Sequence, residues 1–528
     1  MPILSTWPPA ARLLRLLLLL LLLELLAGGC ARRDFFQPDA RVGPGSAAAL
    51  PPGADSVLAT AGRYYNRHSG LYEALLGRHY RRAWAAPVRA PVLRLATAAP
   101  GGLRPGKSGG GYQSISMTLE GIQGREYALR TLDKEPSKTL PAGLRRTFLL
   151  NAVRDATSAA LPYGALTVPP LAQAAGVPHG RPRLVYVRPD ETGLGPTSAR
   201  FQGKLALLEE KYSALASRTP DLAGTTGFVG GEAMLKAVYA DPAHTIDQPA
   251  FLRARLLDLW LGDWDRHEGQ WQWAARPAPG GQVRHQPIPK DRDQVYFRFD
   301  DGALPWLVSR RWLVPRFQTF RARYDNVPGL VYQAIFIDER GLSQLTRADF
   351  GRAAADLLRH LPDTLIERAV RRLPPAVYAL EGPGLAAALR ARRDALPQAA
   401  AAFYRSLARQ PTVGGTARPE HFTVRQYADS VAVRVETGPS AGPGHLLYAR
   451  TFYPAETRRL TLEGLGGDDV FTVVPPPDGH PAARIRLRLR GGPGTNRLDA
   501  PGRHRRLTFD DGSSSPRGGR PYDRPNDD

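Results

Sequence analysis

Cysteine is almost absent from this chain. Its 528 residues include one cysteine, Cys30. A single thiol cannot form an intramolecular disulfide, so packing and polar contacts must stabilise the fold. Basic runs interleaved with aromatic residues, which are typical of proteins that stack nucleic-acid bases, are also missing. We therefore expect no nucleic-acid partner, although the formal net charge is +22.

Acidic residues are scarce relative to basic ones. Asp and Glu total 49 against 71 Lys and Arg, and arginine far exceeds lysine. Arginine, alanine and proline are abundant together, as in chains from GC-rich genomes, so much of the charge is compositional. A basic surface still favours anionic lipid headgroups or an acidic substrate.

The leucine run from Leu16 to Leu26 is shorter than the roughly 20 residues that a membrane-spanning helix needs. Arg12 and Arg15 precede this run, which indicates a targeting segment. The AGGC that ends at Cys30 resembles a bacterial lipobox. We expect a lipoprotein signal peptide over 1–30 with lipidation at Cys30, and ordinary secretion is the alternative. Lipidation would make the membrane a partner and place the protein in the cell envelope, at the outer membrane, facing the periplasm or the surface.

The stretch from Leu256 to Phe299 is the most informative. Apolar residues at helical spacing predict a helix from Phe251, with Asp247 placed to cap it and Gly262 to end it. The following loop, GDWDRHEGQ, gathers three acids, an arginine and a histidine at the edge of the core, which suggests chemistry. The segment 271–288 predicts a hairpin that returns the chain to PKDRDQ.

If this hairpin forms, polar side chains from both flanking loops face one pocket. They are Asp265, His267, Gln270 and Asp291 or Asp293. The spacing Asp-x-x-x-x-Gln resembles the kinase catalytic-loop pattern Asp-x-x-x-x-Asn. The Asp-Arg-His run resembles the loops of atypical kinases, namely phosphoinositide-type lipid kinases, secreted Fam20 kinases, HipA toxins and spore-coat CotH kinases. PIPKDRDQ is most similar to the Asp-x-Asp metal segment of CotH-type kinases.

The pair GDWDRHE and PIPKDRDQ also resembles an uncharacterised segment of Bacteroidetes outer-membrane proteins. In those proteins the segment lies between a metallophosphoesterase and an Omp85-type barrel. This second resemblance extends from about Ala61 to Ala500. It implies outer-membrane barrels or other envelope proteins as partners.

The kinase resemblance implies an α+β fold, in which a two-lobed protein-kinase-like domain precedes a small all-β domain. Asp265 would orient the acceptor hydroxyl with His267 beside it, and Gln270 with Asp291 or Asp293 would bind Mg²⁺ or Mn²⁺ against ATP. Two departures are visible in the sequence. Gln270 replaces the usual Asn, and Asp265 lies farther from Asp291 than a typical kinase requires.

The stretch from Gly101 to Lys134 predicts a glycine turn followed by a two-stranded hairpin. It resembles the start of a kinase small lobe, whose glycines let backbone amides approach phosphate. The resemblance assigns this role to Gly109, Gly110 and Gly111. The next strand would supply a cation, Arg130 with Lys134 as competitor. The following helix would supply its acidic partner, Asp155 by order alone, and a solvent-facing acid is the alternative.

The remaining segments are divided by composition and periodicity. LALLEEKYSAL from Leu205 predicts an amphipathic helix, and period-two alternation from Phe422 to Ala500 predicts a β domain. We expect a flexible tether over 31–55, a strap and small lobe over 56–200, and a mostly helical large lobe over 201–410. A β-rich domain over 411–505 and a disordered tail over 506–528 complete the chain.

The β domain contains a loose internal repeat. GLGGDDVFTV and RGGPGTNRLDA share a Gly-Gly turn followed by Asp or Asn, which resembles the turns of calcium-binding β-rolls. Asp468, Asp469 and Asp499 could supply oxygen ligands for Ca²⁺. Gly-Asp turns also form without any metal.

Three functions are compatible with these patterns. The first is an envelope-anchored atypical kinase-like lipoprotein that transfers phosphate from a nucleotide to a protein, lipid or glycan hydroxyl. The second is a non-catalytic kinase-fold module in outer-membrane biogenesis. The third is a metal-dependent hydrolase in which Asp263, Asp265 and His267 share one ion.

Overall fold

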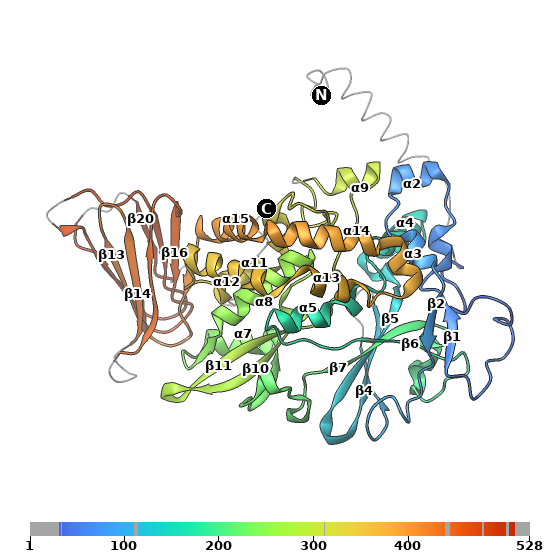
Figure 1. The fold of residues 1–528 in the computed structure, drawn as a ribbon. Coiled ribbons are helices and arrows are strands. Elements are labelled where there is room, and N and C mark those ends of the chain that lie inside the picture. The colour runs from blue at the N-terminus through green and yellow to red at the C-terminus, as the bar shows by residue number, and fades with distance from the viewer. Residues whose placement is uncertain are drawn as a thin grey trace, which may run out of the picture.

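The computed structural model describes residues 31–32, 34–109, 114–310, 312–438, 444–477, 480–502 and 506–512. The fold is mixed α+β, as expected. A β domain lies at one end, a helical body in the middle, and a second group of sheets at the other end (Figure 1). No helix within the described ranges has the length and apolarity to cross a membrane. Cys30 lies outside these ranges, so its lipidation stays a prediction.

The segment expected to be a flexible tether packs against the body instead. The side chain of Gln37 donates a 2.7 Å hydrogen bond to the carbonyl of Thr60, and Ala40 is 2% exposed within the main core. The amide of Ala40 donates to the carbonyl of Gly203 at 2.7 Å. Apolar and amide side chains fix the segment, although its Pro and Gly content suggested a linker. The tether prediction is therefore wrong for Gln37 to Ala40, whereas most residues of 43–55 are exposed.

Short elements follow this segment at the same end of the molecule. Strands β1 (Ser56–Ala59) and β2 (Val88–Pro91) pair antiparallel, and the helices α2 (Gly70–Leu76) and α3 (Arg81–Ala85) lie between them in sequence. Short 3-10 turns, the first at Arg63–Asn66, connect many elements of the chain. The side chain of Trp84 in α3 is 1% exposed, so this strap belongs to the core.

A five-stranded antiparallel sheet with the order β3-β4-β5-β7-β6 forms the next layer. Its strands are β3 (Arg104–Gly109), β4 (Ser114–Glu120), β5 (Glu126–Lys134), β6 (Arg183–Tyr186) and β7 (Leu205–Lys211). The hairpin β4–β5 confirms the strand-turn-strand prediction. Helices α4 (Phe148–Asp155), α5 (Val168–Ala174) and α6 (Ser198–Phe201) are inserted between β5 and β7.

The prediction of a helix from Leu205 is wrong, because β7 occupies that stretch. Leucine, glutamate and lysine favour helices locally, but pairing with β5 and β6 on both sides overrides this preference. The sheet consequently extends to Lys211, beyond the boundary expected at residue 200. This pairing also determines which side chains of β7 face the rest of the molecule.

Helix α8 (Gln248–Leu261) is the central helix of the body. The Asp247 carboxylate accepts the amide of Ala250 at 3.1 Å, and Gly262 ends the helix with φ +67°, so both capping predictions are confirmed. Surrounding helices complete the core. They are α7 (Gly231–Ala240), α10 (Val327–Val331), α11 (Ile335–Gly341), α12 (Arg347–His360), α13 (Asp363–Val370), α14 (Pro375–Asp394) and α15 (Leu396–Ala408).

The predicted hairpin after α8 is confirmed as β10 (Trp271–Ala278) and β11 (Gln282–Pro289). The strands β8 (Gly227–Gly230) and β9 (His244–Ile246) flank it, giving the order β8-β10-β11-β9. Trp271 and Trp273 are both buried and pack on Phe251 of α8, with ring centroids 5.0 and 5.5 Å away. The hairpin is therefore fixed on the central helix and determines where PKDRDQ emerges. The short helix α9 (Ala303–Val308) follows this segment.

The C-terminal domain confirms the prediction of an all-β fold. One sheet has the order β12-β16-β18-β20 and the other β15-β14-β13-β17-β19. The first contains β12 (Thr412–Gly414), β16 (Arg459–Glu463), β18 (Arg486–Arg490) and β20 (Leu507–Asp510). The second contains β13 (Glu420–Gln426), β14 (Val431–Thr437), β15 (Leu446–Phe452), β17 (Val470–Val474) and β19 (Arg497–Asp499). Because β20 belongs to a sheet, residues 507–510 are not part of the expected disordered tail.

All strands of the first sheet are parallel, and so are β13, β17 and β19 of the second. The chain alternates between the two sheets, except at the β14–β15 hairpin, and so winds in stacked coils. The loose repeat noted in the sequence corresponds to two consecutive coils, β16–β17 and β18–β19. The domain docks on the helical body through hydrogen bonds, such as that from the Tyr448 hydroxyl to the carbonyl of Ser343 at 2.9 Å.

Candidate active site

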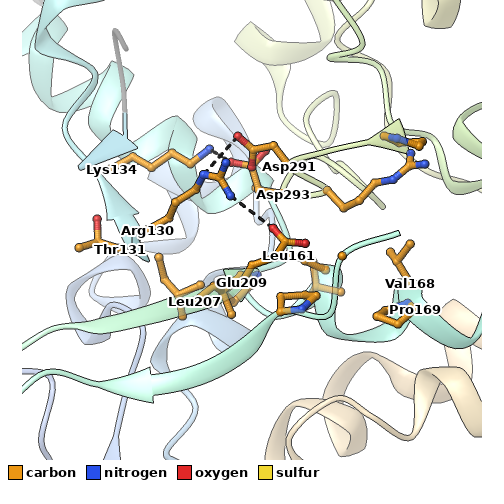
Figure 2. A pocket seen from close by; sticks show the side chains of 18 of the residues that line it. Arg130, Thr131, Lys134, Leu161, Val168, Pro169, Leu207, Glu209, Asp291 and Asp293 are labelled. Atoms are coloured by element: carbon orange, nitrogen blue, oxygen red, sulfur yellow. Dashed lines mark hydrogen bonds and ion pairs between the residues drawn. The ribbon is translucent and has the colours of Figure 1, made fainter. Parts of the chain in front are cut away.

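A cleft lies between the five-stranded sheet and the segment that follows β11 (Figure 2). Arg130 and Lys134 of β5 point into it, opposite Asp291 and Asp293, and Glu209 enters from β7. Apolar side chains form much of the remaining wall, among them Leu132, Leu161, Ala165, Val168, Pro169 and Leu207. Charged groups of both signs thus meet beside an apolar surface, which is typical of a binding site.

Two ion pairs cross the cleft, and a third joins the neighbouring strands β5 and β7. Nη1 of Arg130 lies 3.4 Å from Oε2 of Glu209, and its Nε lies 3.7 Å from Oδ2 of Asp291. Nζ of Lys134 donates a hydrogen bond to the carboxylate of Asp293. The charge of Asp291 raises the pKa of Arg130. Burial opposes the charge of Lys134, but Asp293 and Asp291 outweigh it and raise the pKa of that ammonium.

The acids of the cleft repel one another. Burial and the neighbouring charge of Asp291 raise the pKa of Asp293, and Asp265 adds to this effect. Asp265 also helps to raise the pKa of Lys134, so it lies within electrostatic range of the cleft. For Asp291, burial is outweighed by Arg130 and Lys134, and its pKa is lowered. Asp291 and Asp293 are thus each paired with a cation of β5, and Asp265 adds further negative charge nearby.

The segment Asp291-Arg292-Asp293 has an unusual backbone. Asp291 adopts φ +53°, in the left-handed region that aspartate tolerates better than most non-glycine residues. Arg292 lies between the two acids but is held by Asp258 and Asp263, with Nη1 3.0 Å from Oδ2 of Asp263. One side chain thus anchors the segment while the two flanking acids line the cleft. Strained backbone of this kind is enriched at functional sites.

A buried charge network supports both loops of the site. Arg255 binds Asp338 at 2.7 and 2.9 Å and Asp258 at 2.8 Å. The members of the network lie on α8, on α11, in the loop after α8 and in the segment after β11, and they are Arg255, Asp258, Asp263, Arg266, Arg292 and Asp338. Burial raises the pKa of Asp263 to about 7, although Arg266 and Arg292 oppose this. The network joins α8, α11, the Asp-Arg-His loop and the Asp-Arg-Asp segment.

Arg266, the middle residue of the Asp-Arg-His run, connects the two loops directly. It donates to the carbonyl of Lys290 at 2.7 Å and to that of Gln270 at 2.8 Å. Its guanidinium stacks over Trp271, 4.7 Å from the ring centroid. The Arg266 side chain is fully buried. Its role is to position the loop.

The other predicted residues lie at different places. Among the described residues that line the cleft, Asp265, His267 and Gln270 are not found. His267 accepts the amide of Gly269 on Nδ1 at 3.1 Å and so caps its own turn. Gln270 contributes its carbonyl to Arg266. Gly109 ends β3, whereas Gly110 and Gly111 lie outside the described residues.

Asp155 does not pair with Arg130. Its carboxylate accepts two hydrogen bonds from Arg81, at 2.5 and 2.6 Å, and lies 3.1 Å from Nε2 of His68. These contacts lower its pKa despite burial. The expectation that the helix after β5 supplies the acidic partner is therefore wrong. The acidic partner of Arg130 on its own sheet is Glu209, which lies in a stretch whose composition favours a helix.

Among the described residues, those predicted for the hydrolase metal site and for the calcium site are not grouped around a common point. Asp263 is engaged with Arg266 and Arg292 in the interior, so it does not join Asp265 and His267 around one ion. In the β domain, Asp468 accepts the amide of Thr495 at 2.7 Å, Asp469 accepts that of Glu420 at 2.9 Å, and Asp499 is exposed on β19. Within the described ranges, no three His, Cys, Asp or Glu side chains are placed to hold a metal ion.

Comparisons with protein-family models, curated proteins and solved structures find no match to this chain. The function is therefore inferred from the geometry of the cleft.

Proposed function

We propose that this chain is an envelope-anchored, atypical kinase-like lipoprotein, which transfers phosphate from a nucleotide to a protein, lipid or glycan hydroxyl. The observation that carries the proposal is the meeting of Arg130 and Lys134 with Asp291 and Asp293 across one cleft. Cations that can bind phosphate and carboxylates that can bind a metal ion are the two halves of a phosphoryl-transfer site.

The order of these groups along the chain also supports a two-lobed kinase-like arrangement. Arg130 lies on β5, the third strand of its sheet along the chain, and protein kinases carry their phosphate-binding lysine on a third strand. The glycine-containing hairpin precedes it, and the Asp-Arg-His loop and the Asp-Arg-Asp segment follow in the helical half. Arg266 and Arg292 hold these two loops together from the interior.

In this proposal each residue has one task. Arg130 and Lys134 bind the phosphates, and Arg130 takes over a role in which lysine is usual. Asp265 orients the acceptor hydroxyl and takes its proton as the oxygen attacks the terminal phosphorus. The bond between that phosphorus and the bridging oxygen breaks, and the nucleoside diphosphate leaves. Glu209 holds Arg130 toward the cleft.

Asp291 and Asp293 fit a divalent ion of the Mg²⁺ or Mn²⁺ kind. Mg²⁺ prefers oxygen ligands and is usually held by one or two carboxylates together with substrate phosphates and water. The raised pKa of Asp293, caused by burial and the negative charge of Asp291, is the electrostatic pattern that a bound cation relieves. When bound, such an ion supplies positive charge to the phosphates. Gln270 does not line the cleft, so the proposed metal site consists of Asp291 and Asp293 without it.

Nucleotide binding requires the cleft to open. Its free volume is about 50 Å³, whereas ligand pockets for molecules of this size hold roughly 300 Å³ or more. The side chains of Arg130 and Lys134 reach across the cleft and pair with the opposing acids (Figure 2). The phosphate groups of the nucleotide would replace Asp291 and Asp293 as partners of Arg130 and Lys134. The metal ion would then bind the two released carboxylates.

Calorimetry with ATP in the presence of Mg²⁺ or Mn²⁺ tests the proposal. We expect metal-dependent binding to the wild-type chain and a loss of about tenfold or more in Asp291→Asn, since a tenfold change corresponds to about 1.4 kcal/mol. Asp499→Asn is the matched control, because it removes an exposed carboxylate on β19 of the C-terminal domain. Equal affinities in the two variants would place any binding elsewhere.

A non-catalytic module of the cell envelope is the second candidate. The small free volume and the complete pairing of Arg130 and Lys134 favour it, because both are expected of a cleft that no longer opens. Absence of nucleotide binding with either metal would support this function. The chain would then act through its surfaces, beside barrel-type or other envelope proteins.

A further inference from the structure

The first sheet of the C-terminal domain carries an unusual row of positive charge. Its four strands, β12, β16, β18 and β20, run parallel, so their amino ends meet at one edge. A hollow of about 410 Å³ lies at this edge. Six arginines and Gln410 line it, and we call the six the arginine row: Arg409, Arg458, Arg459, Arg484, Arg486 and Arg506.

The positions of these arginines follow from the strand register. Arg459 and Arg486 are direct partners on the neighbouring strands β16 and β18. Arg506 immediately precedes β20, and Arg409 lies just before β12. Neighbouring strands in a sheet are about 4.8 Å apart, so the coils present guanidinium groups at close and regular intervals.

Nothing in the described part of the chain neutralises this charge. All six side chains are exposed, and none takes part in an ion pair or side-chain hydrogen bond within the described ranges. Arginines elsewhere in the fold are commonly paired, as Arg490 is with Glu463 on the same two strands at 3.1 Å. Like charges directly opposite in a sheet are destabilising. The row therefore lowers the stability of the domain unless an anion binds there.

The lining also limits the chemistry of the ligand. It contains neither an aromatic nor an aliphatic side chain among the described residues, so stacking of nucleic-acid bases has no platform. Guanidinium groups bind phosphate oxygens in a bidentate manner. The volume falls within the roughly 300–1,000 Å³ of typical ligand sites. Several phosphate groups close together on one molecule match six positive charges in such a hollow.

We propose that the arginine row is a binding site for clustered phosphate groups, formed by the amino ends of the stacked strands. The ligand is either a free polyphosphate or the headgroup of a lipid with more than one phosphate. This site is independent of the cleft between β5 and the Asp-Arg-Asp segment and does not rest on the proposed phosphoryl transfer.

Calorimetry of the full chain with inorganic tripolyphosphate tests the proposal. We expect saturable binding that weakens as salt is added, because exposed charges are screened. Arg459→Gln/Arg486→Gln should lose about tenfold or more in affinity, the change that about 1.4 kcal/mol produces. The matched control is Arg425→Gln/Arg497→Gln, which removes two exposed arginines from β13 and β19 of the other sheet and should bind like wild type.

The same variants provide a second measurement that needs no ligand. If the positive charges of the arginine row repel one another in the folded domain, Arg459→Gln/Arg486→Gln should melt at a higher temperature than wild type in the absence of phosphate. Tripolyphosphate should raise the melting temperature of wild type more than that of the double variant. The variant Arg130→Gln/Lys134→Gln removes the two cations of the cleft and so separates binding at the arginine row from binding at the cleft. Tripolyphosphate should still bind to the arginine row of this variant.

Sedimentation with vesicles distinguishes the two sources of phosphate. Binding to vesicles made of equal parts phosphatidylcholine and cardiolipin, but not to phosphatidylcholine alone, identifies a lipid headgroup when the row variant abolishes it. Binding to tripolyphosphate alone identifies a soluble polyphosphate. The proposal is overturned if wild type binds neither, if the row variant and its control bind equally, or if oligothymidylate binds more tightly than tripolyphosphate.

Discussion

Nε of Arg130 lies 3.7 Å from Oδ2 of Asp291, across the cleft between β5 and the segment after β11. The same guanidinium contacts Glu209 from the other side. Arg130 thus holds the place where phosphate would bind and also neutralises an acid that would bind the metal. If the proposed nucleotide and metal bind here, their binding requires the release of this pair.

This coupling predicts opposite effects of one substitution on two ligands. In Arg130→Gln, Asp291 loses its main positive neighbour, so Mn²⁺ without nucleotide should bind at least as tightly as to wild type. ATP with Mn²⁺ should bind about tenfold more weakly or worse, because a charge-assisted contact contributes roughly 1.5–3 kcal/mol. Calorimetry with each ligand measures both effects. A parallel loss of both affinities would mean that Arg130 only maintains the fold.

Asp265 provides a test that separates binding from chemistry. It influences Lys134 and Asp293 electrostatically but does not line the cleft. Asp265→Asn should therefore leave ATP affinity within about twofold and abolish phosphate transfer, because a base acts only on the attacking hydroxyl. Transfer is measured with radiolabelled ATP and envelope extracts as acceptor. Unchanged transfer in this variant would remove Asp265 from the proposed mechanism.

The buried network predicts where stability is most sensitive. Asp258 is 0% exposed and contacts Arg255, Arg266 and Arg292. Asp258→Ala would leave these arginines without a shared acid, and breaking a buried pair costs about 3–5 kcal/mol. Urea unfolding should show this loss, whereas the half-buried Asp265→Ala should change stability by about 0.5 kcal/mol or less. Equal losses would contradict the assignment of Asp258 to the support of the site.

Much of this site could be predicted from local sequence, and the exceptions have physical causes. The cap at Asp247, the end at Gly262 and the Trp271 hairpin depend on short-range signals, and all were correct. The strand β5 is also a local pattern, and the kinase resemblance then pointed to Arg130 and Lys134 on it. Glu209 was missed because β7 has helical composition and becomes a strand only through pairing with β5 and β6.

The direction in which a charged side chain points was harder to predict than the position of the loop that carries it. In the Asp-Arg-His run and the Asp-Arg-Asp segment, the sequence marks charged residues without saying which of them face inward. Arg266 and Arg292 turn into the interior because Asp258 and Asp263 lie there, and Asp258 is contributed by the central helix. Asp155 pairs with Arg81 of the N-terminal strap, a partner far away in sequence. Long-range partners of this kind leave no local signal.

The lipid anchor is testable in a Gram-negative host. The leucine run and the AGGC that ends at Cys30 predict that the full chain partitions with membranes, and that Cys30→Ser is released or left unprocessed. Ala31 donates its amide to the carbonyl of Arg146, so contacts with the folded body begin directly after Cys30 in sequence. Fractionation followed by mass spectrometry of the mature N-terminus measures the outcome. A soluble, unlipidated mature protein that retains Cys30 would refute the prediction.

The β domain contains a buried acid whose ionisation should make stability depend on pH. Glu420, Asp469 and Asn496 occupy equivalent positions on β13, the turn before β17 and the turn before β19. Oδ1 of Asp469 accepts the amide of Glu420 at 2.9 Å, and Oδ1 of Asn496 accepts that of Asp469 at 3.1 Å. Burial, reinforced by the nearby charge of Glu420, raises the pKa of Asp469 to about 8. Burial also raises the pKa of Glu420 to about 7.

Both acids therefore bind protons more tightly in the folded state than in the unfolded state. Their stabilising effect is complete below the ordinary carboxyl pKa and is lost as pH rises toward about 8, by at most about 1.4 kcal/mol per pH unit for each proton. In Asp469→Asn the side chain keeps an acceptor oxygen but cannot ionise. It then resembles Asn496, which occupies the equivalent position on the next coil. The variant should melt above wild type at pH 8 and at nearly the same temperature at pH 4. Calorimetric melting of both proteins across this range measures the difference, and a constant offset at all pH values would show that Asp469 does not titrate on unfolding.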